Sequence, residues 1–157
     1  MSIKPESAEG EAEWEALGKH WLRVDGDVLR LICNGGFDLA EMQRVVQESN
    51  DIGERYGYVM VCLDATHAAW STPEACKYQA NAIRDKVLPN HTVVMGANIM
   101  IRATVGLVHR AVHLITGKTL NSSFVDTEEA ARAVLSRCRQ QFVAQGVARL
   151  PLGNDTT

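Results

Sequence analysis

The sequence has no pair of cysteines at the close spacing of a metal or redox motif. Its four cysteines, Cys33, Cys62, Cys76 and Cys138, lie far apart in a chain of 157 residues. Cys33 and Cys62 fall inside apolar runs, where a thiol usually serves as a small buried hydrophobic side chain. We therefore expect reduced cysteines and no disulfide framework, as is typical of the cytoplasm.

Long apolar runs and strong charge are also missing. No stretch offers the roughly 18 consecutive apolar residues that a membrane span requires. The first 17 residues, MSIKPESAEGEAEWEAL, are acidic and lack the apolar centre of a signal peptide. The formal net charge of −3 gives no basic excess of the kind that nucleic-acid binding needs. These absences predict a cytoplasmic protein without a transmembrane segment or a nucleic-acid partner.

The composition is that of an ordinary globular domain. Apolar residues make up 46% and charged residues 22% of the chain, close to the average for soluble proteins. The length suits one domain with a normal core. We expect a flexible acidic N-terminus over residues 1–16, a single domain over residues 17–146 and a flexible tail over residues 147–157.

Turn and cap signals divide the domain into elements. The pair Asp25-Gly26 between two β-type runs predicts a hairpin over residues 20–33, with positive φ at both turn residues. Asp38 with Glu41 forms a capping box that opens a helix. The following elements are a strand over 58–63, a helix opened by Thr72-Pro73, a strand over 91–97, a helix over 99–116, a strand over 123–125, and a helix opened by an Asp126–Glu129 capping box. This order predicts an α/β fold with a five-stranded mixed sheet and four helices.

Five stretches carry a resemblance to a known family. They are VDGDVLRL (residues 24–31), the helix after GGFD, YVMVCLDA followed by STPEA, the helix IRATVGLVHRAVHLITG, and the closing SSFVDTEEAARAVL. In this order they resemble the STAS fold of anti-sigma-factor antagonists over about residues 19–145. The chain is most similar to the SpoIIAA-like branch, which is grouped with the lipid-binding CRAL-TRIO fold. The resemblance implies a non-enzymatic regulatory or binding module that acts through a protein partner.

The resemblance also implies a candidate phosphorylation site. STAS proteins usually carry an Asp-Ser/Thr-Ser-Gly turn in which the second hydroxyl residue is phosphorylated. Here the matching positions read Asp64-Ala65-Thr66-His67, so Thr66 stands at the acceptor position without the neighbouring hydroxyl or the glycine. Thr66 also lies upstream of the helix start, whose free N–H groups would favour a phosphate. We therefore expect no phosphorylation and a chiefly structural role for the loop.

Polar residues gather where the predicted parallel strands end. Ligands of such sheets bind beyond the carboxyl ends of the strands, and the tentative ligand-binding residues there are Asp64, Thr66, His67, Asn98 and Arg102. The alternative is that they cap helices and hold turns. A Ser71–His67–Asp64 hydrolase triad has no GxSxG elbow to support it. We expect no enzyme activity, no catalytic residue and no cofactor.

The helix over residues 99–116 has an unusually wide apolar arc. Its apolar residues occupy about half the circumference, more than the stripe that covering a sheet requires. The surplus faces a neighbouring helix, a second chain, a membrane surface or an apolar ligand. Ile101, Val105, His109 and His113 are the predicted interface residues, for a protein partner, a homo-oligomer or a lipid-like small molecule. His109 and His113 have zinc-helix spacing, but no third ligand is evident and we expect no metal.

Overall fold

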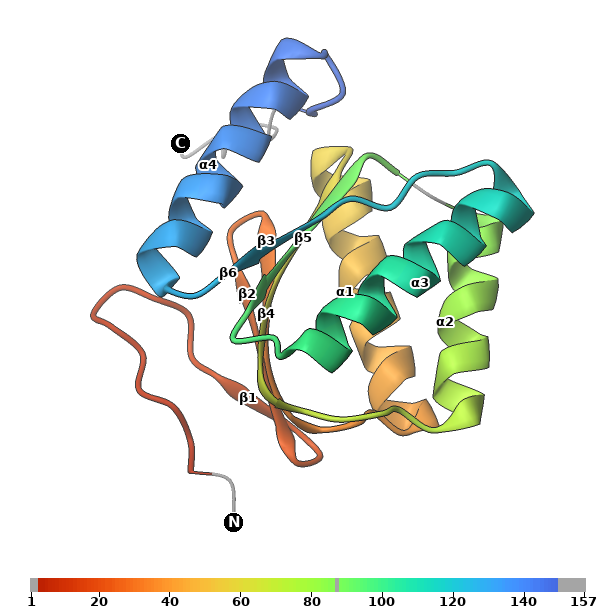
Figure 1. The fold of residues 1–157 in the computed structure, drawn as a ribbon. Coiled ribbons are helices and arrows are strands. Elements are labelled where there is room, and N and C mark those ends of the chain that lie inside the picture. The colour runs from red at the N-terminus through yellow and green to blue at the C-terminus, as the bar shows by residue number, and fades with distance from the viewer. Residues whose placement is uncertain (1–2, 87, 150–157) are drawn as a thin grey trace.

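The computed structural model describes residues 3–86 and 88–149 (Figure 1). Its elements are β1 (Glu15–Leu17), β2 (His20–Asp25), β3 (Val28–Gly35), α1 (Leu39–Tyr56), β4 (Val59–Ala68), α2 (Pro73–Asp85), β5 (Asn90–Met95), α3 (Ile99–Thr116), β6 (Ser122–Val125) and α4 (Glu128–Ala144). They form one sheet in the order β1-β2-β3-β4-β5-β6. The strands β1 to β3 pair antiparallel, and β3 to β6 pair parallel.

The predicted α/β fold is confirmed, with an N-terminal hairpin, a mixed sheet and four helices. The described residues hold six strands rather than five. The additional strand, β1, pairs Glu15 with Leu22 and Leu17 with His20. It crosses the boundary predicted at residue 17, so the sheet begins inside the segment that was predicted to be a flexible N-terminus.

The hairpin turn lies one residue later than predicted. Asp25 is still in β2 and pairs with Val28, which leaves Gly26 and Asp27 as the two loop residues. Only Gly26 has a positive φ, of 60°, so the loop is of the Gly-X class rather than the Asp-Gly class. Because Asp27 is not needed for the turn geometry, its carboxylate is free to bind other elements.

The sheet is covered on both faces. Helices α1, α2 and α3 lie on one face and α4 on the other (Figure 1). The core under α4 consists of residues of the central strands and the helix, namely Val28, Tyr58, Met60, Cys62, Val93, Ala131, Val134, Leu135, Cys138 and Phe142. The core under α1 consists of Leu22, Leu29, Leu31, Cys33 and Ile52. Cys33 and Cys62 are buried free thiols as predicted, whereas Cys76 is exposed.

Three of the helix starts agree with the sequence and one does not. Asp38 and Glu41 form the predicted capping box of α1, and Thr72 accepts a hydrogen bond from the Ala75 N–H to cap α2. Helix α3 begins at Ile99 and ends at Thr116, as predicted. The predicted Asp126–Glu129 capping box of α4 is wrong, because the hydroxyl of Thr127 caps this helix instead.

The start of the predicted C-terminal tail is attached to the domain. The Arg149 N–H donates to the Tyr56 carbonyl over 2.7 Å, and the Val147 N–H donates to the Phe142 carbonyl. Residues 150–157 of that predicted tail lie outside the described residues.

Candidate docking surface on helix α3

Two of the residues predicted to line a ligand site, Asp64 and Thr66, form hydrogen bonds with each other. Strand β4 continues through Ala68, so Asp64, Thr66 and His67 lie within it. One carboxylate oxygen of Asp64 accepts from both the N–H and the hydroxyl of Thr66, over 3.0 and 2.7 Å. His67 is exposed and opposite Asn34 of β3. Asp64 therefore holds the backbone and the hydroxyl of Thr66 within the strand.

Asn98 and Arg102 serve the start of α3. The Asn98 side chain caps the helix by accepting from the Ile101 N–H over 3.0 Å. The Arg102 guanidinium donates to the Ala97 carbonyl and lies 3.5 Å from the carboxylate of Asp126. These two side chains therefore hold the connection between β5, α3 and β6, as the alternative reading of caps and turns predicts.

The hydrolase and metal alternatives gain no geometric support. The Ser71 hydroxyl accepts from the Phe37 N–H over 3.0 Å, which places it in the contact between two loops. Among residues 3–86 and 88–149, no group of three His, Cys, Asp or Glu side chains is arranged to hold a metal ion. His109 and His113 thus have no third ligand among the described residues.

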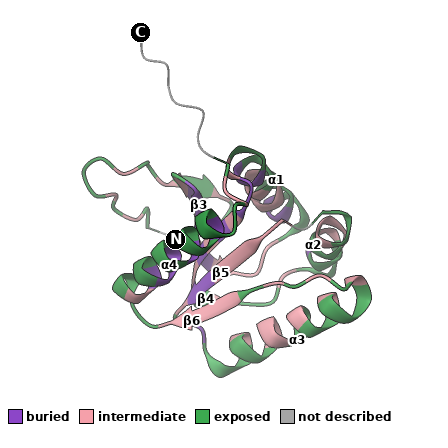
Figure 2. Cartoon of the chain, turned by 90° about the horizontal axis from the view of Figure 1, so that it is seen from above, coloured by how far each residue is buried: buried purple, intermediate pink, exposed green. Residues whose placement is uncertain are grey.

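Helix α3 is the one helix among the described residues that has no buried residue. None of its residues is fully buried, and in Figure 2 it runs along the outside of the molecule with most of its surface exposed. Its large exposed apolar residues are Ile99 (82% exposed), Met100 (62%), Leu107 (68%), Leu114 (84%) and Ile115 (78%). We call these five residues the outer face of α3.

The interface residues proposed from the sequence lie elsewhere on the helix. Ile101 packs against the buried cluster of Ala65, Val94 and Ala97, and Val105 is half-buried. At about 100° per residue, Ile101 and Val105 lie opposite the arc of Ile99, Leu107 and Leu114. They belong to the side of α3 that covers the sheet, and this corrects their assignment to the free surface.

The two histidines lie at the border of the outer face. His109, Arg110, His113, Leu114, Thr119 and Leu120 line a shallow, largely apolar hollow of about 440 Å³. Burial lowers the pKa of His109, which disfavours its charged form. The guanidinium of Arg110 supplies a permanent positive charge at the hollow.

Length and composition make α3 the one helix in the described part of the chain that could cross a membrane. The prediction of no membrane-length apolar segment therefore needs qualification. Both ends of α3 are held in the fold, by the Asn98 cap and by Gly117 with a left-handed φ of 68°. Helix α3 also connects the adjacent parallel strands β5 and β6. It therefore lies along one face of the sheet, with its long side at the surface of the molecule (Figure 1).

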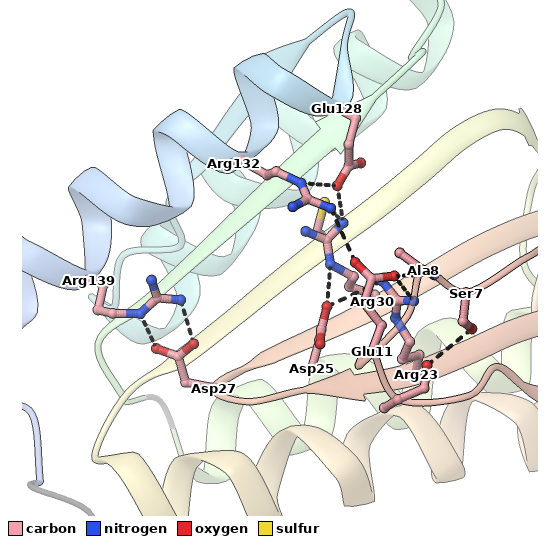
Figure 3. A network of polar contacts seen from close by, with 12 residues as sticks. Ser7, Ala8, Glu11, Arg23, Asp25, Asp27, Arg30, Glu128, Arg132 and Arg139 are labelled. Atoms are coloured by element: carbon pink, nitrogen blue, oxygen red, sulfur yellow. Dashed lines mark hydrogen bonds and ion pairs between the residues drawn. The ribbon is translucent and has the colours of Figure 1, made fainter.

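A second polar cluster lies on the opposite side of the molecule (Figure 3). Glu11 of the N-terminal segment binds Arg23 over 2.8 Å and Arg132 over 3.3 Å. Arg30 lies between Asp25 and Glu128, at 3.4 and 2.7 Å. The three arginines and three carboxylates of this cluster balance in charge. Their ion pairs join the N-terminal segment to the sheet and α4.

The outer face is the candidate docking surface, and the sequence located it only in part. The width of the apolar arc was visible in the sequence, but its rotation relative to the sheet was not. Comparisons with family models, curated proteins and solved structures found no match for this chain. The functional assignment therefore depends on the geometry of α3.

Proposed function

We propose that this protein is a non-enzymatic binding module that docks the outer face of α3 on the surface of a lipid bilayer. The observation that carries this proposal is the exposure of five large apolar side chains, each more than 60% exposed, along one ordered helix. Soluble proteins rarely leave contiguous apolar patches of this kind without an interaction to cover them.

The outer face has enough apolar surface for peripheral binding. Complete burial of one large apolar side chain contributes about 1.5–3 kcal/mol. Five such residues give a gross gain of roughly 7–15 kcal/mol, from which the cost of immobilising the protein must be subtracted. The 18 residues of α3 extend about 27 Å, so these contacts are spread along a line that suits a helix lying in the bilayer interface.

The proposal keeps α3 in its place between β5 and β6. An interfacial helix needs only its apolar face inserted to about 5–10 Å, with its polar side toward water. The inner residues Ile101 and Val105 then stay on the sheet. The capping hydrogen bond that the Asn98 side chain accepts from the Ile101 N–H is retained. No unfolding is required, in contrast to a membrane-spanning arrangement.

The STAS resemblance and its protein partner stay predictions, as does a homo-oligomer. An apolar helix face also fits a partner helix, and sedimentation velocity of the purified protein separates these cases. A dimer that dissociates when the outer face is made polar would favour self-association over the bilayer.

Vesicle cosedimentation tests the proposal. The double variant Leu107→Asn/Leu114→Asn removes two of the most exposed side chains of the outer face. We expect the wild-type protein to sediment with vesicles of equimolar phosphatidylcholine and phosphatidylglycerol, and the variant to bind at least tenfold more weakly. The matched control is Val143→Asn, since Val143 is 59% exposed on α4, on the other face of the sheet.

Urea unfolding of each variant ensures that a loss of binding is not a loss of fold. Binding of the double variant with wild-type affinity would overturn the proposal, as would an equal loss of binding by Val143→Asn.

A further inference from the structure

Building on the proposed docking of α3, we infer that its surface selects anionic bilayers through the basic residues of α2 and α3. This inference assigns a lipid class to the surface. It depends on a second observation, the distribution of charge, that is independent of the apolar side chains.

The charge of the chain is strongly divided. Residues 71–120, which contain α2, β5 and α3, hold six Lys or Arg and two Asp or Glu, for a formal charge of +4. The rest of the chain holds ten basic and seventeen acidic residues, for a charge of −7, which accounts for the total of −3. The positive charge is therefore concentrated in the segment that carries the outer face.

The basic side chains of this segment are on α2, on α3 and at their C-terminal ends. They are Lys77, Arg84, Lys86, Arg102, Arg110 and Lys118. Only Arg84 and Arg102 have a carboxylate within 4.0 Å among the described residues. No acidic side chain among the described residues therefore neutralises the positive charge of the other four basic side chains.

Exposed basic side chains lie on both helices of this segment. Lys77 and Arg84 are exposed and seven residues apart, so they share one side of α2. Arg110 is exposed on α3 and lies between Ile99 and Leu114 in angle. The ammonium group of Lys118 donates to the Arg84 carbonyl over 3.1 Å, which brings the C-terminal ends of α2 and α3 together.

This charge pattern favours an anionic bilayer over a second copy of the same face. Two copies related by a twofold axis would bring two segments of charge +4 against each other. An anionic leaflet instead attracts each basic residue near its surface, by about fivefold in binding for each residue. The acidic N-terminal segment, whose Glu11 binds Arg132 of α4 on the other face of the sheet, would be directed away from the lipid (Figure 1).

The experiment compares vesicles of pure phosphatidylcholine with equimolar phosphatidylcholine and phosphatidylglycerol, at low and high salt. Wild-type protein should bind the anionic vesicles at least tenfold more tightly, and salt should reduce the difference because it screens exposed charges. The variant Lys77→Gln/Arg110→Gln should lose at least tenfold on anionic vesicles and almost nothing on phosphatidylcholine. The matched control, Arg55→Gln/Arg137→Gln, removes the same charge from exposed sites on α1 and α4 and should bind as the wild type does.

Each other result overturns the inference in a way that separates it from the proposed function. Equal binding to both vesicle types would overturn anion selection while the docking of α3 stands. If the control variant lost as much binding as Lys77→Gln/Arg110→Gln, the preference for anionic vesicles would come from the net charge of the protein and not from basic residues of α2 and α3. Absence of binding to either vesicle type would overturn both proposals.

Discussion

Arg139 of α4 donates two hydrogen bonds of 2.6 Å to the carboxylate of Asp27, in the turn between β2 and β3. The Tyr58 hydroxyl donates to the same carboxylate. Asp27 is buried and Arg139 is about half exposed. This contact joins the N-terminal hairpin to the last helix across 112 residues of sequence.

Replacement of Arg139 tests the strength of this contact. Arg139→Ala should lower the free energy of unfolding by about 1–2 kcal/mol, because a buried carboxylate loses a bidentate charged partner whose exposed side is screened by water. Urea unfolding measures the change. Arg137→Ala, on an exposed position of the same helix, should change stability by less than about 0.5 kcal/mol. Equal effects of the two substitutions would contradict a specific role of the pair.

The same contact predicts an acid-sensitive contribution to stability. Burial alone would raise the pKa of Asp27, but hydrogen bonds from Arg139 and Tyr58 outweigh it and lower the pKa below its ordinary value near 3.8. A carboxyl with a lowered folded-state pKa stabilises fully above its unfolded value and loses this contribution as the pH falls through the folded value.

The stability difference between the wild type and Asp27→Asn should therefore be constant near neutral pH and shrink below about pH 4. Urea unfolding over a pH series measures it. A difference that grows toward acid pH would show that the ionised form of Asp27 is not the stabilising one.

The cap of α2 gives a third prediction. The hydroxyl of Thr72 accepts from the Ala75 N–H over 3.2 Å, and Pro73 follows in the first turn. Thr72→Ala should cost about 1 kcal/mol of unfolding free energy, and Thr72→Ser should cost less because the acceptor remains. Unchanged stability of Thr72→Ala in urea would exclude this cap as a stabilising element.

The orientation of α3 gives a fourth prediction. Ile101→Asn should lower the free energy of unfolding by about 1–3 kcal/mol, since it places an amide against the buried cluster of Ala65, Val94 and Ala97. Leu107→Asn, on the outer face, should change it by less than about 0.5 kcal/mol. Urea midpoints of the two single variants decide the matter, and the reverse ranking would mean that the helix is rotated.

The sequence predicted the elements well because their limits are local. The capping box of Asp38 and Glu41, the Thr72-Pro73 start and the Gly117 end of α3 each satisfy free backbone groups within a few residues. The α4 cap was missed because Asp126 and Thr127 are both suitable cap residues, and the local pattern does not choose between them.

The features that were not predicted depend on distant contacts. Strand β1 forms because Glu15–Leu17 finds a partner in β2, while its short sequence has no strand pattern of its own. The rotation of α3 is fixed by the contact of Ile101 with residues of β4 and β5. A wide apolar arc fits several rotations, so the sequence identified the right helix and chose residues on its inner side.

A fluorescent label on α3 tests the central claim most directly. Cys76 is exposed and is first replaced by Ser, while Cys33, Cys62 and Cys138 are buried. Burial raises the pKa of Cys33 to about 12 and that of Cys62 to about 11, so these thiols resist labelling. An environment-sensitive dye is then attached at Leu107→Cys on α3, or at Val143→Cys on α4 as the control.

With anionic vesicles, the emission of the dye at position 107 should shift to the blue as it enters the bilayer interface, and the emission at position 143 should not change. No shift at position 107, or an equal shift at both positions, would contradict the docking of α3 on a bilayer.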